Sequence, residues 1–325
     1  MLERARFLPL VLLLTTWAQA EEIPFPTKRS TILRKGGVVY YVEGRQRIPW
    51  GCEISCQKDV KIVGRGAGAV LEVEGSLQIH GVTDREVIIE NLWIEPAPKF
   101  EDIHLDMVIF RGGGGLRTPK GQACRGGRVF IENADFQSGT TINVGLESGK
   151  LDLTASTASD PVVIRGMAAK DMSQSSLKVV IRGCVHMGGT DGLAGGLFVS
   201  GCRDLTVRIN RLGGATSEFV DNTTCLFDGN KVNSAHLIFR QTRSGRMSKT
   251  KLLKCDIYST KVTLAAPEAK KERVTLDKCW FKGLTKKKQI LEQVITDGED
   301  GGSGAYAKFL KINKRAQELA GAVDR

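Results

Sequence analysis

The sequence predicts an all-β solenoid, in which short strands wind into one elongated coil. A phrase of three apolar residues, a polar corner and an aromatic or aliphatic return occurs at Arg85–Glu95, and it comes back at Arg128–Phe136 and Arg273–Phe281. Degenerate copies of this phrase begin at Val179, Leu197, Cys225 and Lys251. A strand that turns a corner and repeats cannot bury its apolar side alone, so successive copies are expected to stack on one another.

An export signal is expected over residues 1–20. Arg4 and Arg6 precede the apolar run Phe7–Trp17, and Ala18 and Ala20 are the small residues that suit cleavage. This run is too short to span a bilayer comfortably, and no later run approaches the ~20 residues of a membrane helix. An uncleaved anchor is the alternative. We therefore expect a soluble protein, secreted or periplasmic, with no transmembrane segment after cleavage.

The chain is basic, with a formal net charge of +11. Loss of residues 1–20 would leave it almost as positive. Such an excess favours polyanionic partners, namely acidic polysaccharide, phospholipid headgroups or nucleic acid. A generally basic surface with no dedicated partner is the alternative. No nucleic-acid partner is expected, because no aromatic-and-basic motif accompanies the charge.

Eight cysteines lie after the expected cleavage site: Cys52, Cys56, Cys124, Cys184, Cys202, Cys225, Cys255 and Cys279. The last five fall about one coil apart, and most occupy the corner of the repeat. This spacing favours a stack of buried thiols over a disulfide framework, although export would permit disulfides. Cys52 and Cys56 bracket a short loop and are the pair most suited to a bridge. No pair has the CxxC spacing of a zinc site.

The chain divides into one solenoid with short ends. Residues 21–57 are expected to form a lead-in strand and a cap, because an open coil exposes its edge and its apolar cross-section. Coils are expected over residues 58–284, with an inserted loop over 96–128 where the rhythm breaks. Residues 285–325 form a tail, in which an apolar stripe over 305–323 predicts a C-terminal helix. We expect a monomer.

The first coils show how the strands are identified. Val60–Gly66 is a predicted strand ended by glycines, and Val70–Glu74 and Leu77–His80 alternate apolar with polar residues as half-buried strands do. Between Leu177 and Phe281 the copies come closer together. Gly, Asn and Asp at the corners supply the tight or left-handed conformations that sharp bends require.

Three segments resemble the right-handed parallel β-helix superfamily typified by pectate lyases. Asp59–Gly66, followed by Arg85–Leu92, is similar to the "TI-x-G-x-G" and "NVIIRNL" phrases of that family, and Val129–Asn133 resembles its "VWIDH" phrase. The phrases cover about residues 58–136, and the rhythm alone covers 58–282. The resemblance implies that the solenoid is a single right-handed parallel β-helix.

The resemblance bears only in part on activity. The calcium carboxylate of the family's third phrase falls on Glu132, and the histidine of that phrase is replaced by Asn133. The "RxPxxR" phrase that carries the family's catalytic base has no convincing counterpart here. Calcium is thus the one cofactor that the resemblance suggests. The metal-binding residues remain unknown from the sequence.

Glu101–Met107 gives the sharpest local signal. In an extended strand Asp102, His104 and Asp106 share one face, opposite the face that packs on the core. Two carboxylates that flank an imidazole can hold a hard or borderline cation or position a general base, so these three are the candidate catalytic residues. A solvated polar edge opposite a core face is the alternative explanation of the pattern.

A basic stretch without any acid follows, with Arg111, Arg117, Lys120, Arg125 and Arg128. Beside an acidic strand, basic side chains can hold uronate or sulfate groups while carboxylates move protons. Arg111, Arg117 and Arg128, together with Glu132, are therefore the candidate substrate-binding residues. The run of glycines from Gly112 favours a flexible basic loop as the alternative.

Together these patterns favour an exported β-helix protein that binds an acidic polysaccharide and, if it is an enzyme, cleaves it as a lyase or glycoside hydrolase. A non-catalytic structural or surface protein of the cell envelope is the alternative. The two hypotheses differ in geometry. An enzyme requires Asp102, His104 and Asp106 to converge in a groove lined by basic side chains, whereas a scaffold leaves them apart.

Overall fold

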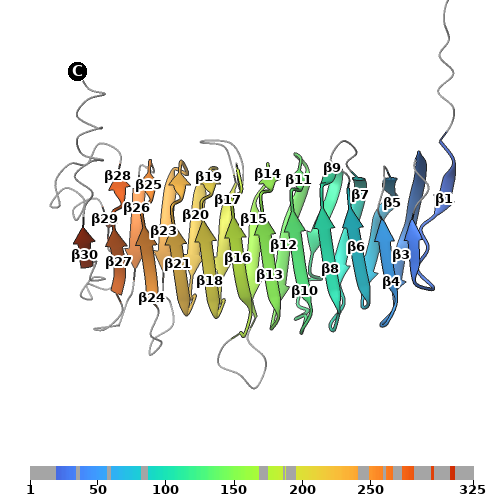
Figure 1. Cartoon of the computed structure of the whole chain (residues 1–325), viewed down its shortest axis with the longest axis horizontal. Helices are drawn as coiled ribbons and strands as arrows, with labels where there is room; N and C mark the ends of the chain where they lie inside the picture. Colours follow the sequence, from blue (N-terminus) through green and yellow to red (C-terminus); the bar gives the residue numbers. More distant parts are fainter. Residues whose placement is uncertain are drawn as a thin grey trace, which may run out of the picture.

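Stacked strands run side by side along one long axis in the computed structural model of the chain (Figure 1). The structure describes residues 20–33, 37–56, 60–81, 87–167, 175–185, 187, 195–240, 249–258, 261–265, 273–281, 294–295 and 308–311. All regular elements in these ranges are β-strands. The all-β solenoid predicted from the sequence is confirmed. The expected export signal lies outside the described residues, apart from residue 20.

Three parallel sheets make up the walls of the solenoid. The first sheet contains β1 (Glu22–Pro24), β3 (Val38–Ile48), β5 (Val60–Val73), β7 (Val87–Pro96), β9 (Val108–Arg117), β12 (Thr140–Leu146), β15 (Val162–Gly166), β17 (Gly196–Ser200), β20 (Thr216–Val220), β23 (His236–Arg240), β26 (Lys261–Ala265) and β29 (Val294–Ile295), with β11 (Asp135–Phe136) and β14 (Thr157–Ala158) beside this path. The second contains β2 (Thr31–Leu33), β4 (Glu53–Cys56), β6 (Ser76–His80), β8 (Asp102–Asp106), β10 (Arg128–Glu132), β13 (Lys150–Thr154), β16 (Lys178–Arg182), β18 (Asp204–Arg208), β21 (Thr224–Asp228), β24 (Lys249–Leu253), β27 (Arg273–Asp277) and β30 (Lys308–Lys311). The third contains β19 (Arg211–Leu212), β22 (Lys231–Val232), β25 (Asp256–Ile257) and β28 (Trp280–Phe281).

Apolar side chains stack in rows inside the coil. Ile103, Val129 and Leu151 hold equivalent positions in β8, β10 and β13 and are fully buried. The residues between them in each strand point outward, because side chains alternate across a strand. Burying each large apolar side chain contributes about 1.5–3 kcal/mol, so the repeated row is a major source of stability.

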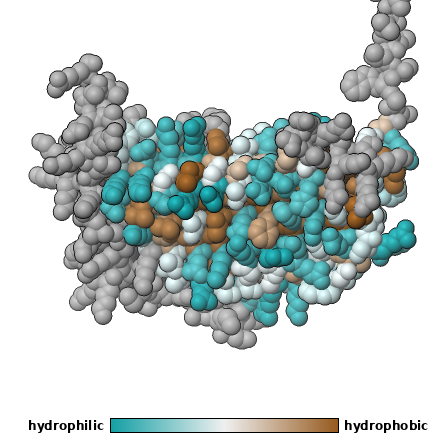
Figure 2. Space-filling view, viewed as in Figure 1, coloured by the Kyte–Doolittle hydropathy of each residue, from teal (hydrophilic) through white to brown (hydrophobic). Residues whose placement is uncertain are grey.

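The outer face of the second sheet carries a mixed surface. Figure 2 shows a band of hydrophobic residues along the middle of this face, with hydrophilic residues on both sides. In the register of the sheet, the middle outward positions of β10, β16 and β21 are Phe130, Val180 and Leu226, all half-buried. The middle of this face is therefore partly apolar.

A residue with a left-handed backbone ends most rungs of the second sheet. The φ values are positive at Met107, Asn133, Ala155, Ile209, Lys254 and Lys278, and at the glycines of two equivalent corners, Gly183 and Gly229. This conformation turns the chain sharply and suits Gly and Asn best. It accounts for Asn133, Gly183 and Gly229, whereas Met107, Ala155, Ile209, Lys254 and Lys278 hold the same backbone without a side chain that favours it.

The residue after each such corner is small and points into the interior. Asn210 and Asn230 stack there, and both are buried. The backbone N–H of Asn210 donates to Oδ1 of Asn230 at 3.0 Å, and the side-chain amides donate to the carbonyls of Ile181 (3.0 Å) and Val207 (2.8 Å). Each buried amide is thus paired, as a stable interior requires.

The cysteines form no disulfide. All eight are free, and all except Cys52 are buried. The expected Cys52 to Cys56 bridge is wrong, because β4 runs extended between these residues. Four residues of strand span ~13 Å, whereas disulfide-linked Cα atoms lie about 4.4–6.8 Å apart. The expected buried thiols are confirmed, and burial raises the pKa of Cys184 to about 11 and that of Cys202 to about 12.

The boundaries of the coil differ from expectation. Residues 96–128 are not an insert, because β8 lies between β6 and β10 in the second sheet and β9 lies between β7 and β12 in the first. The expected cap over residues 21–57 also supplies strands to both sheets. Of the expected C-terminal helix over 305–323, only Lys308–Lys311 lies within the described residues, and it forms β30.

The glycine run explains why the repeat pattern in the sequence is interrupted between residues 96 and 128. Gly112–Gly115 have φ between 75° and 131° and turn a corner inside β9. A Cβ atom on Gly114 would lie 2.2 Å from the carbonyl oxygen of Leu92, and one on Gly115 would lie 2.1 Å from that of Thr141. The run is therefore a tightly packed part of a strand and not a flexible loop. No helix long and apolar enough to span a membrane occurs in the described ranges.

Replacing Gly114 by alanine should destabilise the protein by about 3 kcal/mol or more, because the new methyl group meets backbone that cannot move aside. The matched control is Gly121→Ala, whose φ is also positive (78°) but whose Cβ would meet no atom within 4 Å. It should cost only about 1 kcal/mol from backbone strain. Urea unfolding of both variants measures the difference. An equal loss of unfolding free energy in the two variants would show that the close backbone contact at Gly114 does not contribute to stability.

Candidate functional site

The three candidate catalytic residues share the outer face of β8. Asp102, His104 and Asp106 are half-buried, and they alternate with the buried Ile103 and Leu105. β8 pairs in register with β6 on one side and with β10 on the other. The three side chains therefore form a line across the second sheet, and their neighbours come from the adjacent coils.

This line does not bring the two carboxylates together. Asp102 and Asp106 are four residues apart on an extended strand, so their Cα atoms lie ~13 Å apart. Paired carboxyl groups of glycosidases lie about 5–9.5 Å apart. Each carboxylate also has its own partner. Asp102 lies 3.5 Å from the Arg128 guanidinium, and Asp106 accepts a hydrogen bond from Asn133 Nδ2 at 3.0 Å.

His104 is packed among other rings. Its ring centroid lies 4.4 Å from that of His80 in an edge-to-face arrangement and 5.6 Å from that of Phe130. Burial lowers the pKa of His104, and the charge of His80 lowers it further. Burial also raises the pKa of Asp102, against the opposing effect of Arg128. The lowered pKa favours the neutral imidazole, and among the described residues no carboxylate forms a hydrogen bond that orients it.

The residues do not fit a calcium site. In the described part of the chain, no group of three or more His, Cys, Asp or Glu side chains converges on a point that a metal ion could occupy. Glu132 is exposed and stands opposite Asp106 in the sheet register, while Asp106 is bound to Asn133. Calcium prefers six to eight oxygen ligands, which this surface does not assemble.

The structure separates the candidate substrate-binding residues. Arg128 and Glu132 lie on the second sheet, while Arg111 and Arg117 belong to β9 of the first sheet. Arg111 Nε lies 3.3 Å from Glu90, whose pKa is lowered chiefly by a hydrogen bond from the ammonium group of Lys61. Arg111 is therefore engaged in an ion pair with Glu90, whereas Arg117 lines a cavity formed by described residues.

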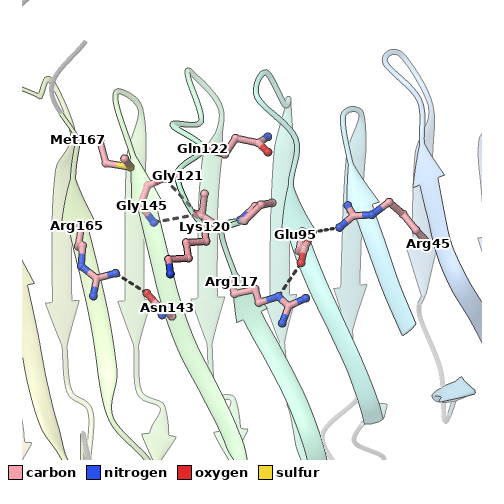
Figure 3. Close-up of a pocket in the computed structure, with 12 residues that line it drawn as sticks. Arg45, Glu95, Arg117, Lys120, Gly121, Gln122, Asn143, Gly145, Arg165 and Met167 are labelled. Carbon is pink, nitrogen blue, oxygen red and sulfur yellow. Dashed lines mark hydrogen bonds and ion pairs between the residues drawn. The ribbon is translucent and has the colours of Figure 1, made fainter. Parts of the chain in front are cut away.

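That cavity has a volume of about 650 Å³ and opens on the first sheet (Figure 3). Its polar side chains come from five strands and one connection: Arg45 of β3, Glu95 of β7, Arg117 of β9, Lys120 after β9, Asn143 of β12 and Arg165 of β15. Ligand pockets in proteins usually have volumes of ~300–1,000 Å³, so this cavity is of the right size for one.

A buried carboxylate holds two of the arginines in place. Glu95 is only 1% exposed, and its two oxygens accept from different guanidinium groups. Arg45 Nη2 donates to Oε2 at 2.7 Å, and Arg117 Nε donates to Oε1 at 2.7 Å. The Arg117 guanidinium also covers the ring of Trp93, 4.1 Å from its centroid. These contacts fix both guanidinium groups while leaving part of each open to the cavity.

The other two cations have no acidic partner. Arg165 Nη1 donates to the amide oxygen of Asn143 at 2.8 Å, and within the described ranges neither Arg165 nor Lys120 forms an ion pair with a carboxylate. The cavity is thus lined by four cationic side chains and one carboxylate. This surplus of positive charge beside fixed guanidinium groups suits an anionic ligand.

Sequence reasoning singled out Arg117 and named Lys120 in the same basic stretch, but it did not predict that they meet the other residues of the cavity. Arg45, Glu95, Asn143 and Arg165 are scattered over more than a hundred residues and meet only because their coils stack. One signal was present. Glu95 ends the apolar return of the first repeat copy, where a buried residue is expected, and a buried carboxylate requires cationic partners.

The His80 and His104 pair makes a titration test possible. Replacing His80 by glutamine should raise the pKa of His104, while burial should keep it below 6.5, the ordinary value. NMR titration of the imidazole resonances measures this, with His236→Gln on the first sheet as the control. Because the folded pKa is lowered, the unchanged protein should lose stability as the pH falls below about 6.5. A His104 pKa at or above 6.5 in the unchanged protein would contradict the packing described here.

Comparisons with family models, with curated proteins and with solved structures give no match to this chain. The fold and the geometry of its surfaces therefore carry the functional argument.

Proposed function

We propose that this chain is a carbohydrate-binding β-solenoid, and that the cavity on its first sheet holds the carboxylate or sulfate groups of an acidic polysaccharide. The surplus of cationic side chains around the buried Glu95 is the observation that carries the proposal. Guanidinium groups suit this task, since their fork of N–H donors matches the oxygens of carboxylates and sulfates.

The shape of the cavity favours a polymer over a small anion. Its cationic side chains extend from β3 to β15, which are five steps apart in the strand order of the first sheet. Neighbouring strands lie ~4.8 Å apart, so the row is ~24 Å long. A single small anion would contact one end of such a row. A chain lying along the solenoid axis would place successive anionic groups near Arg45, Arg117 and Arg165.

The same geometry supports binding without cleavage. Glu95 is the one carboxylate that lines the cavity, and both of its oxygens are engaged by arginines. A general base needs a free lone pair within reach of the substrate proton. Asp102, His104 and Asp106 lie on the second sheet and do not supply it. The export signal expected over residues 1–20 would bring such a binding protein to the compartment where acidic polysaccharides occur.

Binding should weaken when the unpaired cations are removed. Arg165→Gln and Lys120→Gln should each raise the Kd for a polyuronate or a sulfated polymer by about 3- to 10-fold, because each deletes one exposed charge-assisted contact. The loss should shrink at high salt, which screens such contacts. Calorimetry or a glycan column measures the effect. Lys178→Gln, an exposed change of the same charge on the second sheet, is the matched control.

Two outcomes would contradict the proposal. Equal weakening by all three variants would mean that the polymer responds to net charge and not to the cavity. No retention of the unchanged protein on any acidic polymer would remove the proposed function altogether. Incubation with the same polymers, with and without calcium, should release no new reducing or unsaturated ends.

A further inference from the structure

Cys255 and Cys279 occupy the same corner of two consecutive coils. β24 pairs with β27 before this corner, and β25 pairs with β28 after it, so the register is held on both sides. The backbone N–H of Trp280 donates to the carbonyl oxygen of Cys255 at 2.8 Å, inside the corner itself. The preceding residues, Lys254 and Lys278, have φ of 48° and 55°. Both thiols therefore leave the backbone in the same direction, one coil apart.

The distance between these corners suits a covalent bridge. Paired parallel strands lie ~4.8 Å apart, which falls within the ~4.4–6.8 Å between Cα atoms of disulfide-linked cysteines. Parallel side chains start with Cβ atoms at about the same ~4.8 Å separation, slightly above the ~3.5–4.5 Å of a disulfide. An approach of less than ~1 Å would close the gap.

The two thiols lie near one another. Their mutual interaction lowers the pKa of Cys279, which favours a thiolate there, while the thiols donate to backbone carbonyls, Cys255 Sγ to Leu253 at 3.1 Å and Cys279 Sγ to Asp277 at 3.6 Å. Among the described residues Cys202 and Cys225 also lie near one another, since Cys202 raises the pKa of Cys225, but they hold non-equivalent positions: Cys202 precedes β18 and Cys225 lies within β21. Cys184 lies at the same corner three coils away, and the stacked Asn210 and Asn230 separate it from Cys255. The interior offers one adjacent pair among the corner cysteines.

We propose that Cys255 and Cys279 are a modification site, at which an oxidant of the disulfide class joins consecutive coils by a disulfide. The Cys279 thiolate attacks the oxidant and forms a mixed disulfide, and the Cys255 sulfur then displaces the second half of the oxidant. The protein loses two protons and two electrons as one S–S bond forms, and the disulfide of the oxidant is reduced to two thiols. Both cysteines are buried, so exchange takes place before the coil closes or during local opening.

The bridge would act on the interface between two consecutive coils. Coils of a solenoid contact only their neighbours, so a covalent bond between consecutive coils strengthens the contact that holds them together. A bond between Cys255 and Cys279 closes a loop of 23 intervening residues. Such a loop restricts the unfolded chain and links these two coils.

The test uses the full chain and oxidised glutathione as the oxidant. The reduced protein is equilibrated across a series of glutathione redox mixtures, denatured, alkylated and mapped by mass spectrometry. The expected result is a Cys255 to Cys279 linked peptide and six alkylated thiols out of eight. Hydrogen exchange in β24, β25, β27 and β28 should slow at least about tenfold on oxidation, because local opening of these coils becomes rarer.

Two variants provide the controls. Cys279→Ser should abolish the linked peptide and the slowing of exchange, whereas Cys184→Ser, a buried corner cysteine without a thiol neighbour, should retain both. Eight alkylated thiols at every redox ratio, or a bridge between other cysteines, would overturn the proposal. Disulfide mapping of the unchanged protein tests the proposal even where a variant fails to fold. If the disulfide proposal fails, the proposed anion-binding cavity is unaffected, since no cysteine lines that cavity.

Discussion

The in-register stacking of parallel coils is the constraint on which the rest of the structure depends. Each side chain lies over its equivalent in the next coil, at a separation of ~4.8 Å between strands. Apolar residues gain from this arrangement, but like charges repel one another. Ion pairs therefore run between coils. Arg208 pairs with Asp228 across β18 and β21, and Arg128 pairs with Asp102 across β10 and β8. The cavity on the first sheet gathers four cations, of which Arg45 and Arg117 share Glu95, while Lys120 and Arg165 form no ion pair within the described ranges.

The fold could be predicted from the sequence because each stacked strand has a local pattern of residues. Apolar residues alternate with polar ones along each rung, and a corner residue with positive φ, such as Asn133, follows the rung. The prediction failed at the glycine run. Gly112–Gly115 turn the chain inside β9, and backbone approaches Gly114 and Gly115 too closely for a Cβ atom, but in the sequence alone such a run resembles a flexible loop.

The candidate site was harder to predict because it depends on register between coils. Asp102, His104 and Asp106 are neighbours in the sequence, and their shared face follows from the period of a strand. In an extended strand these residues lie far apart along the sheet. Their closeness in the sequence therefore does not bring their side chains to one point. Arg45 and Glu95 are 50 residues apart yet lie 2.7 Å from each other. Their meeting depends on the length of every coil between them, and coil lengths cannot be read from apolar alternation.

A straight solenoid is better suited to repeated contacts than to convergent chemistry. Its outward side chains form rows with one fixed spacing along the axis and another along each strand, so groups from different rows rarely meet at one point. The cavity around Glu95 is an exception, because cations from several coils gather there. Its single lining carboxylate accepts hydrogen bonds from Arg45 and Arg117. A periodic anionic chain, as proposed for the ligand, would match such a row unit by unit. The cavity presents mainly N–H donors to whatever enters it, because both oxygens of its one carboxylate already accept from Arg45 and Arg117.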